Sequence, residues 1–406
     1  MSTEAAHALG LKVIVFGPDT NDGMAPPAAQ VADGFIQADY TDTDALADFA
    51  RQTDLVTLEF ENVSPIALDT LSRLGVPVYP NKQALETFSN RLQEKTFFST
   101  HGLPTVPFEA LANLSDRAAV EAAVARIGTP CVLKTAGFGY DGKGQYRLDH
   151  PTDLAGVLEK AALDQPYIVE SWVALAFEIS VIGARTTLTQ GGETQTAFYW
   201  PFLNHHRHHI LDTTQWPAPV DATMAEAAQH LTNRILTLLD YRGLLCVEFF
   251  VTADGQLLIN ECAPRPHNSG HVTQHAAVCS QFEQHVRAVC GLPLSEPSLK
   301  PGIGGAAMVN LLGDHLPRNP DLNPDLNMNL TVDPVAWAAS LPANSHGVWY
   351  GKASARPGRK MGHINVLAAS PDEAVEQALA HRAALNTATP PTGTKPGSQA
   401  GSQPIG

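Results

Sequence analysis

The segment LLCVEFFVTADGQLLINECAPRPHNSGH, residues 244–271, carries the strongest structural signal in this sequence. Asp254 and Gly255 form a turn signal between two apolar runs, which predicts a β-hairpin. A two-residue loop sets Glu248 directly opposite Glu261, and a four-residue loop leaves both on one face in a diagonal arrangement. A three-residue loop separates them unless a bulge intervenes.

Two carboxylates that face each other across a strand pair repel, unless a cation lies between them. Magnesium is bound by one or two carboxylates together with substrate phosphates. Glu248 and Glu261 are therefore predicted as metal ligands for Mg²⁺, with Mn²⁺ as the alternative ion. The competing interpretation is a pair of solvent-facing glutamates on an edge hairpin. The apolar neighbours LLCV and LLI favour the buried metal site.

The second informative segment is TAGFGYDGKGQ, residues 135–145, which matches two phosphate-loop patterns. A P-loop needs Ser or Thr after its lysine, but Gly144 follows Lys143. The segment is preceded by CVLKTA and followed by QYRLD, which both resemble strands, whereas a P-loop or a dinucleotide-binding turn leads into a helix. A glycine flap between two strands remains, and an ordinary hairpin is its alternative.

Composition limits the classes of function. The chain has 406 residues, 44% of them hydrophobic, and a formal net charge of −15. This charge disfavours nucleic-acid binding, so phosphate groups need a local basic pocket. We expect no membrane span, because no long apolar run occurs. Five scattered cysteines suit a reducing cytoplasm.

The order of elements predicts an α/β beginning. Strands at 11–16, 55–60 and 76–80 alternate with helices at 43–52 and 65–75, which indicates a parallel sheet. One long helix is predicted at 83–101, and another at 115–128 with Ser115 as its cap and Gly128 as its stop. A proline-rich region with short strands and a helix at 370–385 follows the central part.

Four motifs together resemble one enzyme family. TLEFENV (57–63), GYDGKGQ (139–145), NECAPRPHNSGH (260–271) and YGKASARPGRKMGH (350–363) are similar to N5-carboxyaminoimidazole ribonucleotide synthetases of the ATP-grasp superfamily. The resemblance implies an α/β and α+β chain with an ATP-grasp fold. Its expected parts are an N-terminal parallel-sheet (pre-ATP-grasp) domain, a lid with the glycine flap, a central metal-binding subdomain, a small C-terminal β-rich region and a disordered tail, at residues 1–85, 86–170, 171–296, 297–385 and 386–406.

The resemblance also implies roles for individual residues. Arg265, His267 and Asn268 should face the reacting groups. Glu61, Asn62, Lys352, Arg359 and Lys360 should bind the ribonucleotide substrate. The residues expected to bind ATP come from several segments: Arg91, Lys134, Gly139, Tyr140, Asp141, Gly142, Lys143, Gly144, Gln145, Glu170, Ser171, Trp172, Val173, Glu178, His206, Asn260 and Glu261.

Two of these assignments have structural alternatives. The basic segment KASARPGRKMGH, residues 352–363, is either a phosphate site or a solubilising surface loop. Its glycines favour the phosphate site, because they let the backbone approach a ligand. The run NHHRHHIL, residues 204–211, suggests zinc, but no cysteine lies nearby and adjacent histidines point in different directions. Only His206 is therefore expected to be functional.

The implied reaction is the ATP- and bicarbonate-dependent carboxylation of aminoimidazole ribonucleotide through carboxyphosphate, in purine biosynthesis. The expected partners are these three small molecules, and neither nucleic acid nor membrane is expected. A homodimer is expected, and its product should be the substrate of a downstream mutase. One alternative is a related ATP-grasp ligase or formyltransferase, which would lack the RKMGH segment. Another is a non-catalytic nucleotide-binding protein.

Two departures from the family pattern bear on these expectations. The family opens with a strand and a G-G-G-Q-L-G turn, whereas this chain starts where the first helix is expected. We therefore expect the N-terminal sheet to lack one strand and one ligand-facing loop. Asn90 stands where the family has aspartate before the arginine of the ATP site.

Overall fold

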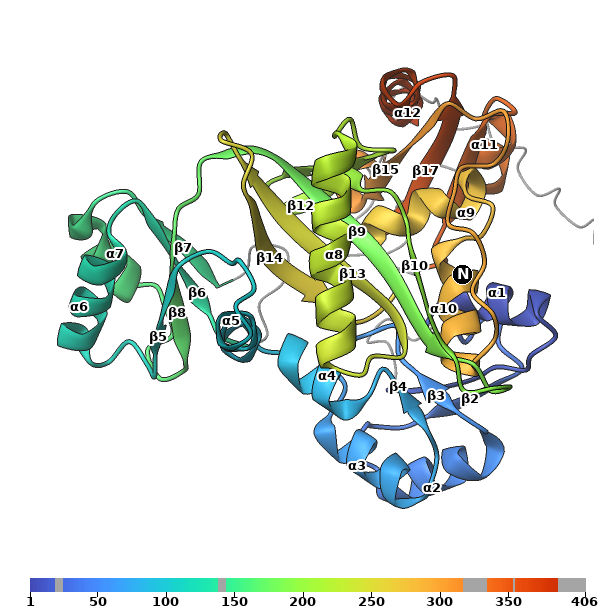
Figure 1. Cartoon of the computed structure of the whole chain (residues 1–406), viewed down its shortest axis with the longest axis horizontal. Helices are drawn as coiled ribbons and strands as arrows, with labels where there is room; N and C mark the ends of the chain where they lie inside the picture. Colours follow the sequence, from blue (N-terminus) through green and yellow to red (C-terminus); the bar gives the residue numbers. More distant parts are fainter. Residues whose placement is uncertain (19–24, 138–143, 317–333, 353–354, 386–406) are drawn as a thin grey trace, which may run out of the picture.

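The computed structural model describes residues 1–18, 25–137, 144–316, 334–352 and 355–385. Figure 1 shows three parts: an N-terminal α/β part in blue, a small lid in teal, and a large central sheet in green to red. Among the residues so described, no helix combines the length and the apolar character needed to cross a bilayer.

The N-terminal part contains two parallel strand pairs, so the predicted parallel pairing is found, but the strand at 34–37 was not predicted. β1 (Ile14–Gly17) pairs with β2 (Gly34–Gln37), and β3 (Val56–Thr57) pairs with β4 (Val78–Tyr79). The helices α1 (Ser2–Ala8), α2 (Thr43–Gln52) and α3 (Pro65–Arg73) belong to this part. Leu46, Phe49 and Leu71 form its core. The two pairs are separate two-stranded sheets within the described residues.

The single helix predicted at 83–101 is wrong. The structure has α4 (Lys82–Phe88) and α5 (Arg91–Thr100), because the side chain of Asn90 caps α5 by accepting hydrogen bonds from Leu92 N and Gln93 N. Asn90 adopts an extended conformation to do so, which interrupts the helix. The cap of α6 (Arg117–Ile127) is Asp116 rather than Ser115, and its stop is Gly128, as predicted.

The lid is a four-stranded sheet covered on one face by helices. Its strand order is β5 (Phe108–Leu111), β8 (Tyr167–Ser171), β6 (Cys131–Thr135) and β7 (Gln145–Leu148). α6, a short 3-10 turn (Pro151–Asp153) and α7 (Leu154–Leu158) lie together over this sheet (Figure 1). Since β6 and β7 pair antiparallel, the glycine segment between them connects two strands, as predicted.

In the part of the chain that the structure describes, the large sheet has nine strands and extends into the C-terminal region. The strands of its main path are, in order, β14 (Leu257–Ala263), β13 (Gly243–Thr252), β9 (Leu175–Thr187), β11 (Phe202–Arg207), β12 (Ile210–Trp216), β15 (Gly305–Leu312), β17 (Lys360–Ala368) and β16 (Ser345–Trp349), and β10 (Thr194–Phe198) pairs with β9. Antiparallel pairing of β12 with β15 joins the C-terminal strands to the central sheet.

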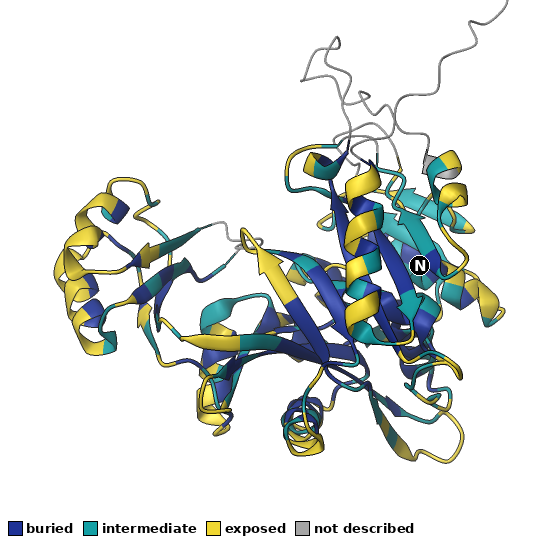
Figure 2. Ribbon diagram, turned by 90° about the horizontal axis from the view of Figure 1, so that it is seen from above, coloured by how far each residue is buried: buried dark blue, intermediate teal, exposed yellow. Residues whose placement is uncertain are grey.

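Helices cover the large sheet on both faces. α8 (Ala222–Leu238) crosses β9 and β13 on the side visible in Figure 1, while α9 (Thr273–Ala276) and α10 (Gln281–Cys290) lie beside β10. A 3-10 segment (Asn268–Val272) precedes α9, and another (Gly313–His315) follows β15. α11 (Pro334–Ser340) and α12 (Pro371–Leu385) complete the C-terminal part. Figure 2 shows that the central strands are largely buried, so this sheet is the rigid base of the cleft described next.

Candidate active site

The hairpin of β13 and β14 has a three-residue loop and a bulge, one of the three arrangements that the sequence left open. Beyond the bulge, Val251 pairs with Leu257 and Phe249 with Ile259. The register then shifts, so that Glu248 lies directly opposite Glu261. The bulge thus restores the pairing of glutamates that a three-residue loop alone would lose.

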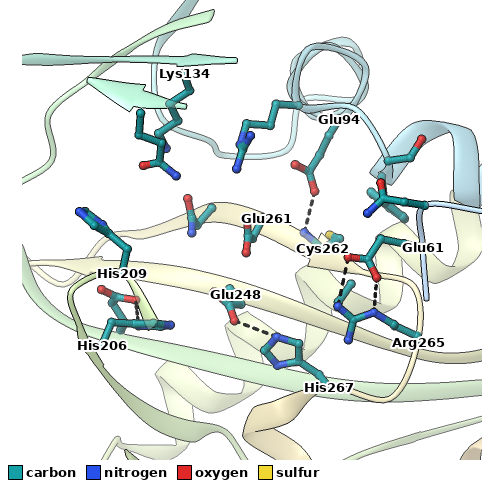
Figure 3. A pocket seen from close by; sticks show the side chains of 18 of the residues that line it. Glu61, Glu94, Lys134, His206, His209, Glu248, Glu261, Cys262, Arg265 and His267 are labelled. Carbon is teal, nitrogen blue, oxygen red and sulfur yellow. Dashed lines mark hydrogen bonds and ion pairs between the residues drawn. The ribbon is translucent and has the colours of Figure 1, made fainter. Parts of the chain in front are cut away.

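The extra residue at the bulge is Asn260, and this has a direct consequence for the cleft. Successive side chains of a regular strand point to opposite faces. Because the strand is bulged here, Asn260 and Glu261 both line the same cleft. Two neighbouring oxygen donors from β14 therefore face Glu248 of β13, as Figure 3 shows for the two glutamates.

Glu94 of α5 is a further carboxyl group beside Glu248 and Glu261 in this cleft, and the sequence analysis missed it. Its Oε1 accepts a hydrogen bond from Cys262 N at 2.6 Å, and the residue is 3% exposed. Burial, together with the nearby charge of Glu261, raises the pKa of Glu94 to about 8. The same two causes raise the pKa of Glu248 to about 8. A bound cation would offset the repulsion between these buried carboxyl groups.

We expect Glu94 to act by holding the backbone of β14 beside Glu261. Glu94→Ala removes the acceptor of Cys262 N and should lower metal-dependent turnover about 10- to 100-fold, the range for groups that orient metal ligands. Glu94→Gln retains an oxygen acceptor and should keep most of the activity. Turnover of both variants at a series of Mg²⁺ concentrations checks this. An equal loss in both would assign the effect to the charge of Glu94 instead.

A buried triad of charges lies between the lid and α5. Glu170 of β8 contacts Lys95 Nζ at 3.2 Å and Lys134 Nζ at 2.5 Å. Burial alone would raise the pKa of Glu170, but the two ammonium groups outweigh it and lower the pKa to about 2. The triad fixes Lys134 at the edge of the cleft. Lys95, which is 2% exposed, had no local signal in the sequence, because its partner is about seventy-five residues away.

The opposite end of the cleft joins the central sheet to the N-terminal part. Arg265 donates two hydrogen bonds to Glu61, one of them from Nη2 to Oε1 at 3.1 Å. His267 Nε2 lies 3.2 Å from Glu248 Oε1, and its Nδ1 lies 2.9 Å from Ser269 Oγ. Burial lowers the pKa of His267 well below its ordinary value, and the nearby cations Arg265 and Lys360 lower it further. These effects favour the neutral form of the imidazole.

Gln281 of α10 holds His267 in this position and is a second residue that the sequence analysis missed. Its Oε1 accepts from His267 N at 2.9 Å, and its Nε2 donates to His267 O at 2.7 Å. A side chain at Gly270 would overlap Gln281, since an added Cβ would lie 2.4 Å from Gln281 Oε1. Gly270 of the NSGH motif thus leaves space for the side chain of Gln281, which holds His267.

Comparisons with known proteins agree with this geometry. Three family models match: the ribonucleotide synthetase preATP-grasp domain at residues 1–89, the ATP-grasp domain at 96–282 and the phosphoribosylaminoimidazole carboxylase C-terminal domain at 306–377. The chain is 38% identical over 365 residues to the N5-carboxyaminoimidazole ribonucleotide synthase of Brucella melitensis, covering 90% of this chain and 92% of that protein. It belongs to the N5-carboxyaminoimidazole ribonucleotide synthase family.

Two solved structures are also similar. The ADP complex of an N5-carboxyaminoimidazole ribonucleotide synthetase matches with a TM-score of 0.81 at 35% identity, over 94% of this chain and 93% of that one. The Aspergillus clavatus synthase in complex with ADP and 5-aminoimidazole ribonucleotide matches with a TM-score of 0.79 at 27% identity, over 96% of each chain.

Among the predicted site residues that the structure describes, most lie in one cleft. Those that line it are Glu61, Asn62, Arg91, Lys134, Gln145, Glu178, His206, Glu248, Asn260, Glu261, Arg265, His267 and Lys360. Residues 139–143 of the flap lie outside the described part of the chain, and Gly144 is positioned just before β7.

Other predicted residues lie beside the cleft rather than along it. Asn268 exchanges amide hydrogen bonds with Asn310 at 2.7 and 3.1 Å. The carboxylate of Glu170 faces the two lysines, so a contact of residues 170–173 with ATP stays a prediction. Trp172 is 44% exposed, and the Arg147 guanidinium stacks 4.0 Å from its ring centre.

The basic loop is attached to the cleft through Lys360. Lys352 Nζ donates to Lys360 O at 2.7 Å, so it supports the loop from within. Gly351 and Gly358 have φ angles of 66° and 72°, which few other residues adopt. Lys352 and Arg359 are not among the described residues that line the cleft, so their contact with a substrate phosphate stays a prediction.

Among the described residues, the histidines of residues 204–211 are not grouped with other side chains of metal-ligand type. Within the described ranges, no three His, Cys, Asp or Glu side chains form a group that could hold a metal ion. His206 Nδ1 instead pairs with Glu178 Oε2 at 2.8 Å. Burial would lower the pKa of His206, but the hydrogen bond to Glu178 and the charge of Glu248 raise it.

Proposed function

We propose that this protein carboxylates 5-aminoimidazole ribonucleotide with ATP and bicarbonate, giving N5-carboxyaminoimidazole ribonucleotide. The main support is the opposed pair Glu248 and Glu261 in a cleft that also presents Lys134, Arg91 and Arg265. The relative from Aspergillus clavatus, which was solved with ADP and 5-aminoimidazole ribonucleotide, shares the fold over nearly the whole chain.

The donor set of the hairpin fits magnesium. Two carboxylates and the amide oxygen of Asn260 are hard oxygen ligands, and Mg²⁺ usually completes its shell with water and substrate phosphates. The raised pKa of Glu248 supports this fit, because burial and the nearby charge of Glu261 both disfavour an ionised carboxyl group there, and a cation would offset both effects. When bound, the ion would neutralise charge on the transferring phosphoryl group. Glu248, Glu261 and Asn260 would hold it.

The protein's own residues divide the reaction between the two ends of the cleft. Arg91 and Lys134 bind ATP phosphates while an oxygen of bicarbonate attacks the γ-phosphorus, so that the bond to ADP breaks and carboxyphosphate forms. Arg265, oriented by Glu61, holds the carboxylate part. The exocyclic amine then attacks the carboxyl carbon, phosphate leaves, and His267, which lines the same cleft, accepts the proton that the amine loses.

The experiment that tests this function is ATP turnover with each substrate omitted in turn. ADP release should require both 5-aminoimidazole ribonucleotide and bicarbonate, and the carboxylated product should form in equal amount. Turnover that needs a different acceptor would point to a related ATP-grasp ligase, and ATP binding without any turnover would point to a nucleotide-binding protein.

We expect Lys360 to bind the substrate ribonucleotide rather than ATP. Losing a charge-assisted phosphate contact costs about 1.5–3 kcal/mol, which is roughly 10- to 100-fold in affinity. Lys360→Ala should raise the KM for the ribonucleotide by about that factor, with little change for ATP. Arg359→Ala tests the predicted role of its neighbour in the same assay.

Lys160→Ala, at an exposed lysine of the lid, is the matched control for this pair of titrations. A KM for ATP that rises in the Lys360 variant would place the lysine in the nucleotide half of the cleft. If neither KM moves, residues 352–363 are a surface loop.

Three finer points belong to the same proposal. The product of this reaction is an N-carboxylated amine, which a downstream mutase consumes by moving the carboxyl group to carbon. We further propose a homodimer, which sedimentation would test, and action in the cytoplasm, which agrees with five free cysteines.

A further inference from the structure

The hairpin between β11 and β12 turns through two histidines in an unusual backbone conformation. Arg207 pairs with Ile210, so the loop consists of His208 and His209 alone. Their φ angles are 51° and 63°, both left-handed. A two-residue turn with two positive φ angles normally uses Asn-Gly, Asp-Gly or Gly-Gly, because a Cβ is strained there.

The two histidines differ in where their side chains lie. His209 belongs to the described residues that line the cleft, whereas His208 does not. In Figure 3 the His209 ring extends from the wall that carries His206 toward the wall that carries Lys134. Its neighbour His206 is already paired with Glu178, so His209 is the second imidazole presented to the same part of the cleft.

Backbone strain at a cleft is retained when the side chain it presents has a function. A glycine at position 209 would relieve the strain but would leave nothing to face the cleft. We propose that His209 is a nucleotide-binding residue that donates a hydrogen bond to the ribose or phosphate oxygens of bound ATP. An imidazole suits this role, since a ring N–H can donate to either kind of oxygen.

This inference rests on the proposed use of ATP. Two glycine variants distinguish the contribution of the His209 ring to ATP binding from the effect of the turn conformation. His209→Gly and His208→Gly both relieve a left-handed residue, so both should raise the melting temperature of the unliganded protein. Only His209→Gly should weaken binding of a non-hydrolysable ATP analogue, by about 3- to 10-fold in calorimetry. His209→Asn, which tolerates the same φ and keeps a donor, should retain most of the affinity.

Two binding results would overturn the proposed role of His209. Affinity for the analogue that is unchanged in His209→Gly overturns the proposal. An equal loss in His208→Gly also overturns it, because the conformation of the turn and not the ring would then be responsible. Since binding is measured without the ribonucleotide, a wild-type protein that binds the analogue but fails to carboxylate would refute the proposed function and leave this test valid.

Discussion

Glu261→Gln is expected to reduce turnover by at least a hundredfold, beyond the loss typical of groups that only orient metal ligands. Glu261 faces Glu248 across the hairpin, and glutamine cannot supply the second negative charge for a cation. Removing that charge also relieves the repulsion, so the metal-free variant should be at least as stable as the wild type.

A thermal-shift series with ATP and Mg²⁺ checks this prediction together with the turnover assay. A ligand at a hundred times its Kd stabilises a protein by about 2.7 kcal/mol. The wild type should therefore show a clear rise in Tm when Mg²⁺ is added to the ATP complex, and the variant a far smaller one. Glu226→Gln, at an exposed position on α8, is the matched control. Near-normal turnover in Glu261→Gln would refute the metal assignment.

Glu170→Gln is expected to destabilise the protein by about 3 kcal/mol at pH 7. The pKa of Glu170 is lowered from 4.5 to about 2 in the folded protein, and each unit corresponds to about 1.4 kcal/mol. Because the folded-state pKa lies below the unfolded one, this contribution is fully present above about pH 4.5. It is lost as the pH falls toward 2.

The measurement is the free energy of unfolding of both proteins between pH 7 and pH 3. The gap between wild type and Glu170→Gln should narrow as the pH falls below about 4.5, because the carboxyl is then protonated in the unfolded chain but still ionised in the folded protein. Glu109→Gln is the control, because Glu109 pairs with Arg126 at the surface and such pairs contribute at most about 1 kcal/mol. A gap that stays constant with pH would show that the charge of Glu170 contributes nothing.

The local sequence was sufficient for several features of this protein. Asp254-Gly255 between apolar runs predicted the hairpin, and its register narrowed the positions of Glu248 and Glu261 to three arrangements. The alternation of strands and helices in the first eighty residues predicted parallel pairing, which β3–β4 confirms, while β1 pairs in parallel with β2, a strand that was not predicted. These features depend on interactions between residues close in the chain, so spacing and residue type report them directly.

Other features arise only when distant segments meet. The bulge at Asn260 shifts the strand register by one residue, so that Glu248 faces Glu261 despite the three-residue loop. It also lets the side chains of Asn260 and Glu261 line the same cleft. Glu94 lies beside Glu261 because α5 packs against β14, and Lys95 is paired with Glu170 from the lid. The C-terminal strands join the central sheet through β12 and β15. A buried charge depends on what surrounds it in space, and neighbours along the chain do not reveal those partners.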